Sequence, residues 1–228
     1  KPEAEDLVVR TAARLARELG IHLHVGSTAI ARGDGKVANR GFLFGPDGGK
    51  RAAYDKVHMF DVDLDNGESW RESATYEPGT TSTVVELPFG RLGMAVCYDL
   101  RFPQLFRAQA LAGAQILTVP AAFTRQTGEA HWHVLQRARA IENGAFVIAA
   151  AQGGLHEDGR ETYGHSMIVD PWGRIVAEAV SNGPEVVLAE IDVAACEQAR
   201  RKIPNLRNAR DFEVSVAEAV AAPERRTA

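Results

Sequence analysis

Three short runs of almost entirely apolar residues constrain the fold of this chain more than any other feature. They cover residues 92–96, 116–120 and 145–151. A strand with one face in water alternates apolar and polar residues, whereas a run with almost no polar residue is typical of a sheet covered on both faces. Helical patterns separate these runs, so the sequence predicts an α/β fold in which helices cover mixed sheets.

Periodicity and turn residues predict the remaining elements. Apolar residues recur at helical spacing from Leu7 to Leu19 and stop at Gly20, a common residue at helix ends. Pro46-Asp-Gly-Gly49 is a strong turn signal between two strands and predicts a hairpin. The predicted helices are 7–19, 103–112, 131–143 and 194–202, and the predicted strands are 21–30, 41–44, 52–59, 92–96, 116–120, 146–151 and 186–191, with a last hairpin turning at 170–173.

Composition limits the number of domains and the kinds of partner. The 228 residues, 45% of them hydrophobic, suffice for one large core without a linker, so we expect one domain over 1–228 with a disordered tail at 221–228. The net charge of −4 has no basic cluster to offset it, which disfavours a nucleic-acid partner. No apolar run approaches the roughly 20 residues that cross a bilayer, and the charged first residues do not resemble a signal peptide. We therefore expect a cytoplasmic protein with no membrane partner.

One of the two cysteines stands where a nucleophile is expected. Cys97 follows the apolar run 92–96, and Pro103 then opens a helix, so Cys97 lies at a strand-to-helix turn. Such a turn exposes the side chain and leaves backbone N–H groups unpaired near it, which stabilise an oxyanion or a thiolate. A free cysteine is also among the most buried residue types, so Cys97 taken alone fits packing as well. Cys196 lies in a predicted helix and fits inert packing; the pair gives no disulfide framework.

Several motifs surround Cys97 in the order and spacing of a known family. With them the chain resembles the nitrilase, or carbon–nitrogen hydrolase, superfamily from about Leu7 to about Phe212. Residues 149–156 and the Tyr-Gly-His-Ser-Met that begins at Tyr163 are most similar to the deaminated glutathione amidase branch, with the ω-amidase branch close behind. The motifs are Tyr54-Asp-Lys-Val-His-Met-Phe60, Arg71-Glu-Ser-Ala-Thr-Tyr-Glu-Pro-Gly79, the segment around Cys97, Phe123-Thr-Arg-Gln-Thr-Gly-Glu-Ala-His-Trp132, Arg137-Ala-Arg-Ala-Ile-Glu-Asn143 and Tyr163 to Gly173.

The resemblance implies a fold and a reaction. The fold is an α-β-β-α sandwich of two mixed sheets, with subunits that pair through outer helices into a homodimer or a larger homo-oligomer. The thiol of Cys97 attacks a small-molecule amide and forms a thioester that water hydrolyses, with no cofactor. Lys56 and the backbone N–H of Tyr98 stabilise the oxyanion, and Glu72 orients Lys56. Glu68 and Glu77 are the alternatives to Glu72 if the loop register differs.

The general base of the family has no counterpart in this chain. Relatives place it as a glutamate at the end of an early strand, after an apolar run and a proline. Glu3, Glu5 and Glu18 precede or belong to the first helix, and none of them follows an apolar strand. We expect that the chain begins late relative to the family, without the N-terminal strand and helix. The alternative is a chain that has lost the base and serves as an inactive binding or assembly subunit.

The segment 123–132 supplies the predicted substrate contacts. Phe123 is expected to form a pocket wall, while Thr127 and His131 belong to a loop that leads into the helix and lines the pocket in the family. Arg125 either pairs with a substrate carboxylate or is solvated. His131 and His133 stand two apart on a helix and face different directions, so we expect no metal site.

Other polar residues near the motifs receive lesser roles. Asp99 and Arg101 are interpreted as an ion pair or cap that holds the nucleophile turn. A Cys97, His165 and Asp170 triad is disfavoured, because the proton carrier of the family is a glutamate; His165 fits better as a packed strand residue.

The predicted function is hydrolysis of a small amide that bears a carboxylate, with deaminated glutathione as the leading substrate. A dicarboxylate ω-amide such as α-ketoglutaramate is the alternative, and an N-carbamoyl amino acid is a third option. All three rest on the resemblance alone.

Overall fold

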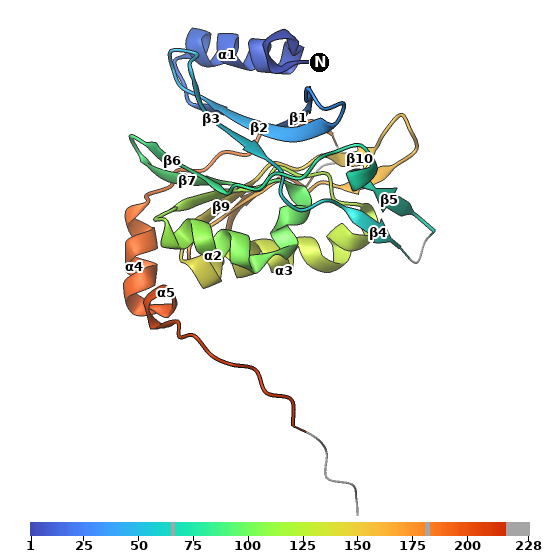
Figure 1. Cartoon of the computed structure of the whole chain (residues 1–228). Coiled ribbons are helices and arrows are strands. Elements are labelled where there is room, and N and C mark those ends of the chain that lie inside the picture. The colour runs from blue at the N-terminus through green and yellow to red at the C-terminus, as the bar shows by residue number, and fades with distance from the viewer. Residues whose placement is uncertain (65–66, 181–182, 218–228) are drawn as a thin grey trace, which may run out of the picture.

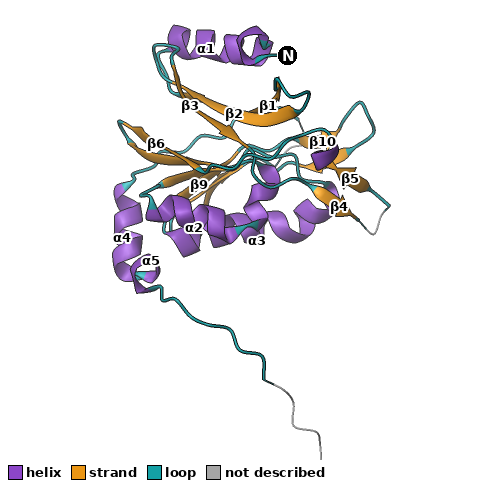
Figure 2. Ribbon diagram, viewed as in Figure 1, coloured by secondary structure: helices purple, strands orange, loops and turns teal. Residues whose placement is uncertain are grey.

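The computed structural model describes residues 1–64, 67–180 and 183–217, and the tail predicted at 221–228 lies outside the described residues. Its elements form four layers, in the order helix, sheet, sheet, helices (Figure 1, Figure 2). Helix α1 (Leu7–Leu19) covers a three-stranded sheet, a six-stranded sheet packs beneath that, and helices α2 (Pro103–Leu111) and α3 (Arg125–Asn143) form the last layer. The predicted α-β-β-α sandwich is therefore confirmed. Within the described ranges, no helix has both the length and the apolar character that a membrane crossing requires.

The remaining elements are further helices, 3₁₀ turns and the strands of the sheets and ribbons. Two further helices, α4 (Ala194–Lys202) and α5 (Asn205–Asn208), stand at one end of the sandwich (Figure 1). The 3₁₀ turns are η1 (Glu3–Glu5), η2 (Glu72–Ala74) and η3 (Cys97–Arg101). The strands are β1 (Leu23–Ala31), β2 (Val37–Phe44), β3 (Lys50–Asp55), β4 (Asp61–Asp63), β5 (Ser69–Arg71), β6 (Thr83–Leu87), β7 (Gly90–Met94), β8 (Ile116–Thr118), β9 (Phe146–Ala149), β10 (Gly153–Leu155), β11 (Glu161–Tyr163), β12 (Met167–Val169) and β13 (Ile175–Glu178).

The two large sheets differ in strand direction. Strands β1, β2 and β3 form an antiparallel sheet, in which the predicted turn at 46–49 joins β2 to β3. The larger sheet has the order β13-β12-β9-β8-β7-β6, with β7, β8 and β9 parallel at its centre and antiparallel strands on both sides. The three apolar runs of the sequence contain or overlap these central strands. The runs hold almost no polar residue because the sheet is covered on both faces there. The pairs β4-β5 and β10-β11 form separate two-stranded ribbons.

A separate apolar core fills each of the three spaces between the layers. Phe42 and Phe44 of β2 pack with the buried face of α1, whereas Leu43 between them points into the space between the sheets. The same alternation places Ile116 between the sheets and Leu117 against α2 and α3. Successive side chains of one strand point to opposite faces of its sheet, so each sheet packs against the layer above it and the layer below it.

Two predicted boundaries near the site and one predicted strand were wrong. Helix α3 begins at Arg125 rather than at residue 131, because Thr124 caps it by accepting a hydrogen bond from the N–H of Thr127. Strand β3 ends at Asp55, so residues 56–59 lie beyond the strand that was predicted to contain them. No strand forms at 186–191, where Val186 and Leu188 stay exposed because no neighbouring strand pairs with the segment. The closing helix at 194–202 is confirmed as α4.

Truncating Leu117 at the centre of the larger sheet tests the layered core. Leu117 is fully buried, so Leu117→Ala leaves a cavity and is expected to lower the free energy of unfolding by about 2–5 kcal/mol. Leu111→Ala, at an exposed position of α2, is the matched control and is expected to change it by less than about 0.5 kcal/mol. Urea unfolding followed by circular dichroism measures both, and equal losses would contradict the assigned core.

Candidate active site

A cavity of about 700 Å³ opens where the three parallel strands end. The residues that follow β7, β8 and β9 all line it, at the carboxyl edge of the sheet where α/β proteins usually bind ligands. Parts of the two ribbons border the same cavity, through Trp70 of β5 and Arg160 beside β11. Cys97, Lys56 and Glu72, which are far apart in sequence, meet on its wall.

Cys97 occupies a strained backbone position at the mouth of the turn. Strand β7 ends at Met94, and Cys97 opens η3 with a φ of 51°, a left-handed conformation that is rare outside glycine. Its N–H donates to the carbonyl of Pro120 at 2.9 Å, which ties the turn to the segment after β8. The predicted strand-to-helix turn is confirmed, with η3 inserted before α2. The N–H of Tyr98 belongs to the first residues of η3, which have no acceptor within the turn.

Asp99 holds this turn against the other sheet. Its fully buried carboxylate accepts from the N–H of Val96 at 2.9 Å and from the Tyr54 hydroxyl at 2.8 Å. It also accepts from the backbone N–H and the Nδ1 of His58 at 3.1 and 2.7 Å. The predicted cap is therefore present, but the predicted ion pair is not, since the Arg101 guanidinium lies 3.2 Å from Nδ1 of His131 instead.

Lys56 and Glu72 form a buried ion pair beside the thiol. Lys56 is only 3% exposed, and its Nζ donates to Oε2 of Glu72 at 2.5 Å. Glu72 also accepts from Nδ2 of Asn39 at 3.0 Å and from the N–H of Phe60 at 2.7 Å. The structure thus places Glu72 at Lys56, and the alternatives Glu68 and Glu77 are not its partners there.

A glycine allows the segment that carries Glu72 to approach β3. The N–H of Gly79 donates to the carbonyl of Lys56 at 2.8 Å. A Cβ at Gly79 would lie 2.2 Å from the carbonyl oxygen of Asp55, so only glycine fits this contact. The Pro78-Gly79 end of the motif therefore fixes the loop in which Glu72 lies.

The surroundings of Cys97 act on its thiol in opposite directions. Burial raises the pKa of Cys97 above its ordinary value, and the positive charge of Lys56 opposes this rise. Glu72 and Asp99 add to the rise through their negative charges. The net direction is upward, so the resting thiol is protonated at neutral pH and needs an acceptor for its proton before it attacks.

Of the four residues predicted to contact the substrate, two line the cavity and two do not. Phe123 and Thr127 line the cavity. His131 and Arg125 do not: both lie on α3 with exposed side chains, because the helix begins earlier than predicted. Arg125 pairs with Glu129 and Glu161 on the surface.

Besides Arg71, which pairs with Asp63, two further arginines that were not assigned to the substrate from the sequence line the cavity. The Arg101 guanidinium lies 5.3 Å from the ring centre of Phe123 and 6.0 Å from that of Tyr98, and no carboxylate of the described chain pairs with it. Arg160 stacks on Trp70 at 5.4 Å and pairs with Asp158. The place of Arg101 four residues after the nucleophile was a usable signal, whereas nothing in the sequence linked Arg160 to the cavity.

Glu72 is the single carboxylate on the cavity wall within the described residues. The disfavoured triad is not assembled there, because His165 binds Glu178 and Asp170 binds Arg174. His165 also does not lie in a strand, as it had been interpreted, but in the connection between β11 and β12.

Comparison with known proteins agrees with this geometry. The family model described as carbon–nitrogen hydrolase matches residues 2–201. The chain is 46% identical over 202 residues to a deaminated glutathione amidase of Yersinia enterocolitica. The aligned region covers 86% of this chain and 69% of that protein. It is 41% identical over 179 residues to the ω-amidase NIT3 of Saccharomyces cerevisiae, covering 78% and 61%. The crystal structure of the C. elegans NitFhit protein superimposes with a TM-score of 0.84 at 40% identity, covering 90% of this chain and 50% of that one.

The chain therefore belongs to the carbon–nitrogen hydrolase family, as its motifs indicated. It spans 60% to 69% of the length of deaminated glutathione amidases such as those of Mus musculus and Yersinia enterocolitica.

The opposing charges around Cys97 give a test by alkylation. Lys56→Met removes the charge that lowers the pKa of Cys97, so the pH of half-maximal alkylation by iodoacetamide is expected to rise. Glu72→Gln removes a charge that raises this pKa, so the midpoint is expected to fall. Lys50→Met, at an exposed lysine of β3, is the control and should leave it unchanged. Peptide mapping separates Cys97 from Cys196; midpoints that move together in the two site variants would contradict the assignment.

Proposed function

We propose that this protein hydrolyses the amide bond of a small substrate that bears a carboxylate, with Cys97 as the nucleophile. The observation that carries the proposal is the meeting of Cys97, Lys56 and Glu72 on one cavity wall. This arrangement supplies a thiol, a cation for a developing oxyanion and a carboxylate that orients the cation.

The reaction proceeds in two steps. The sulfur of Cys97 bonds to the amide carbon as the thiol loses its proton, and Lys56 and the Tyr98 N–H stabilise the tetrahedral oxyanion. The C–N bond then breaks, and the leaving nitrogen takes up the proton that the thiol released. Water then adds to the thioester, and the C–S bond breaks to give a carboxylate and the restored thiol. Glu72 is assigned to positioning, because Lys56, Asn39 and Phe60 already donate to its oxygens.

Arg101 is proposed to bind the substrate carboxylate, which was one of the two alternatives left open for Arg125 from the sequence. Its guanidinium faces the cavity without an acidic partner among the described residues, and a planar guanidinium suits bidentate binding of a carboxylate. The packing of Arg101 against Phe123 and Tyr98 fixes the direction in which it points.

Deaminated glutathione is the proposed substrate, and α-ketoglutaramate is the second candidate. Both carry the same acyl group and would form the same thioester; they differ in the group that leaves, a dipeptide amine in the first and ammonia in the second. A cavity of about 700 Å³ has room for the larger leaving group, and relatives at 46% identity are named for that substrate. The relative at 41% identity supports the second. Failure of both substrates would favour the inactive-subunit alternative.

We also propose one cytoplasmic hydrolase domain that forms a homodimer through α3. Val134 and Ile141 stand seven residues apart on that helix, so they share one face, and both are more than half exposed. An apolar stripe on an outer helix suits a partner subunit.

Replacement of Cys97 tests the nucleophile. Cys97→Ala is expected to reduce turnover of deaminated glutathione by more than about 10⁴-fold, because no thioester forms without the sulfur. Cys196→Ala is the control and should retain activity, since Cys196 is buried beside Gln115 and does not line the cavity. Release of the dipeptide amine is measured for the parent chain and for both variants.

Replacement of Arg101 tests the carboxylate site. Arg101→Gln is expected to lower kcat/KM for both carboxylate substrates roughly 10- to 100-fold. This factor corresponds to the free energy that a hydrogen bond to a charged group contributes. Turnover of a neutral amide of similar size should change little, and Arg125→Gln is the matched control on the same measurement. An equal loss on the neutral amide would mean that Arg101 supports the turn and does not bind the carboxylate.

A further inference from the structure

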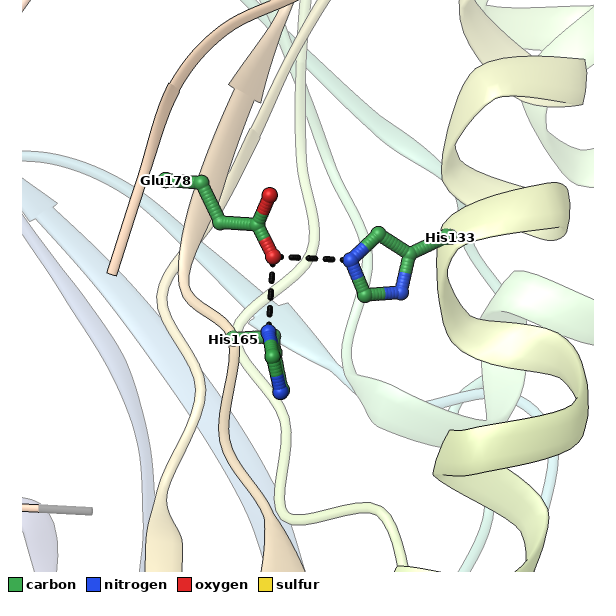
Figure 3. A group of neighbouring side chains, drawn as sticks. All are labelled: His133, His165 and Glu178. Atoms are coloured by element: carbon green, nitrogen blue, oxygen red, sulfur yellow. Dashed lines mark hydrogen bonds and ion pairs between the residues drawn. The ribbon is translucent and has the colours of Figure 1, made fainter. Parts of the chain in front are cut away.

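Two histidines and a glutamate converge outside the catalytic cavity. His133 lies on α3, His165 in the connection between β11 and β12, and Glu178 at the end of β13 (Figure 3). Oε1 of Glu178 lies 2.8 Å from Nε2 of His133 and 2.7 Å from Nδ1 of His165. The three ligand atoms all lie within 4.8 Å of one another, and none of the three residues lines the catalytic cavity.

The surrounding residues hold the two imidazoles in place. His165 has a left-handed φ of 56°, and its carbonyl accepts from Nε1 of Trp132 at 2.8 Å. The ring of Tyr163 stacks on that of His165 at 4.3 Å. A Cβ at Gly128 would lie 2.2 Å from Tyr163, so this glycine leaves the space in which the tyrosine packs against α3. Strain of this kind persists only where the surroundings impose it, and here it directs the His165 ring toward Glu178.

The second nitrogen of His133 has a partner suited to a metal ligand. Nδ1 of His133 lies 3.4 Å from the hydroxyl of Tyr163. Histidines that bind a metal through one nitrogen usually donate the N–H of the other to an oxygen acceptor, most often a carboxylate, a backbone carbonyl or water, which fixes the tautomer. The hydroxyl oxygen of Tyr163 can accept in the same way. Tyr163 would thus leave the lone pair of Nε2 for an ion, while His165 would carry its proton on Nε2 and offer Nδ1.

We propose that His133, His165 and Glu178 bind one Zn²⁺ ion. Two imidazole nitrogens and a carboxylate oxygen are a common set of protein ligands for zinc, with water in the fourth position. The side chains are 31%, 30% and 23% exposed, so the ion has a path from solvent and room for that water. Oε1 of Glu178 lies closer to the two nitrogens than ligand atoms do around a bound ion, so the carboxylate would move away from them to reach Zn²⁺ distances of about 2.0–2.2 Å.

The site would join three segments that lie far apart in the sequence. It connects α3 to strand β13 and to the turn before β12, which holds Ser166 on the cavity wall. This reverses the sequence expectation of no metal site, which considered His133 only with His131. The actual partners of His133 are 32 and 45 residues further along the chain, and no spacing rule could have joined them.

Calorimetric titration of Zn²⁺ into the 228-residue chain tests the proposal. A version with Cys97→Ser and Cys196→Ser contains no thiol, so any zinc that it binds is held by other ligands. We expect one equivalent bound in this version, and a Kd at least about 10-fold weaker in His133→Ala and in Glu178→Gln. His131→Ala, two residues away on the same helix, is the matched control and should bind as the parent does. Mg²⁺ should not compete, since it prefers oxygen ligands.

Glu178→Gln is expected to fold, because its amide oxygen still accepts hydrogen bonds from both imidazoles. Circular dichroism confirms the fold of each variant. Binding should also raise the Tm of the parent and not that of Glu178→Gln. No binding, binding lost with the cysteines, or equal affinity in His131→Ala, His133→Ala and Glu178→Gln would each overturn the proposal.

Discussion

The geometry of the site depends on one buried carboxylate, that of Asp99. Its two oxygens accept from Val96 at the end of the larger sheet and from Tyr54 and His58 at the end of the smaller one. Asp99 lies two residues after Cys97, and Lys56 lies between Tyr54 and His58, so the same contacts set where the cation stands relative to the thiol. A buried charge is stable only when its hydrogen bonds are made. Loss of any partner of Asp99 would therefore destabilise the folded state, because the carboxylate would stay buried without full compensation for its lost hydration. The hydrogen bonds of Asp99 therefore hold the two sheets together next to Cys97 and Lys56.

The electrostatics of the cavity follow from that constraint. Burial raises the pKa of Cys97 and makes the proton hard to remove, yet it also strengthens the attraction between Lys56 and any negative charge that forms on sulfur or on the substrate oxygen. Glu72 limits the excess positive charge and holds Lys56 in one direction. Arg101 stands apart from this pair, stacked between aromatic rings, and is available to a second negative group. In the proposed reaction, Lys56 stabilises the oxyanion and Arg101 binds the remote carboxylate of the substrate.

The sequence predicted what is local or carried by contiguous motifs. The apolar runs identified the buried parallel strands, and the family resemblance of the motifs around Lys56, Glu72 and Cys97 implied that these three residues act together. The N-terminus of α3 was misplaced because its first two turns carry few apolar residues and the cap is a single threonine, so His131 and Arg125 were assigned to a loop. The convergence of His133, His165 and Glu178 depends on how a helix packs over a sheet, and that tertiary contact leaves no pattern along the chain.

Trapping the acyl intermediate tests the central claim most directly. Deaminated glutathione is mixed with the protein, the reaction is quenched in acid within the first turnover, and the mass of the intact chain and of its peptides is measured. We expect one acyl group, attached through a thioester to the peptide that contains Cys97 and released by hydroxylamine, with the same mass when α-ketoglutaramate is used. Turnover without any adduct, or an adduct on the Cys196 peptide, would contradict it.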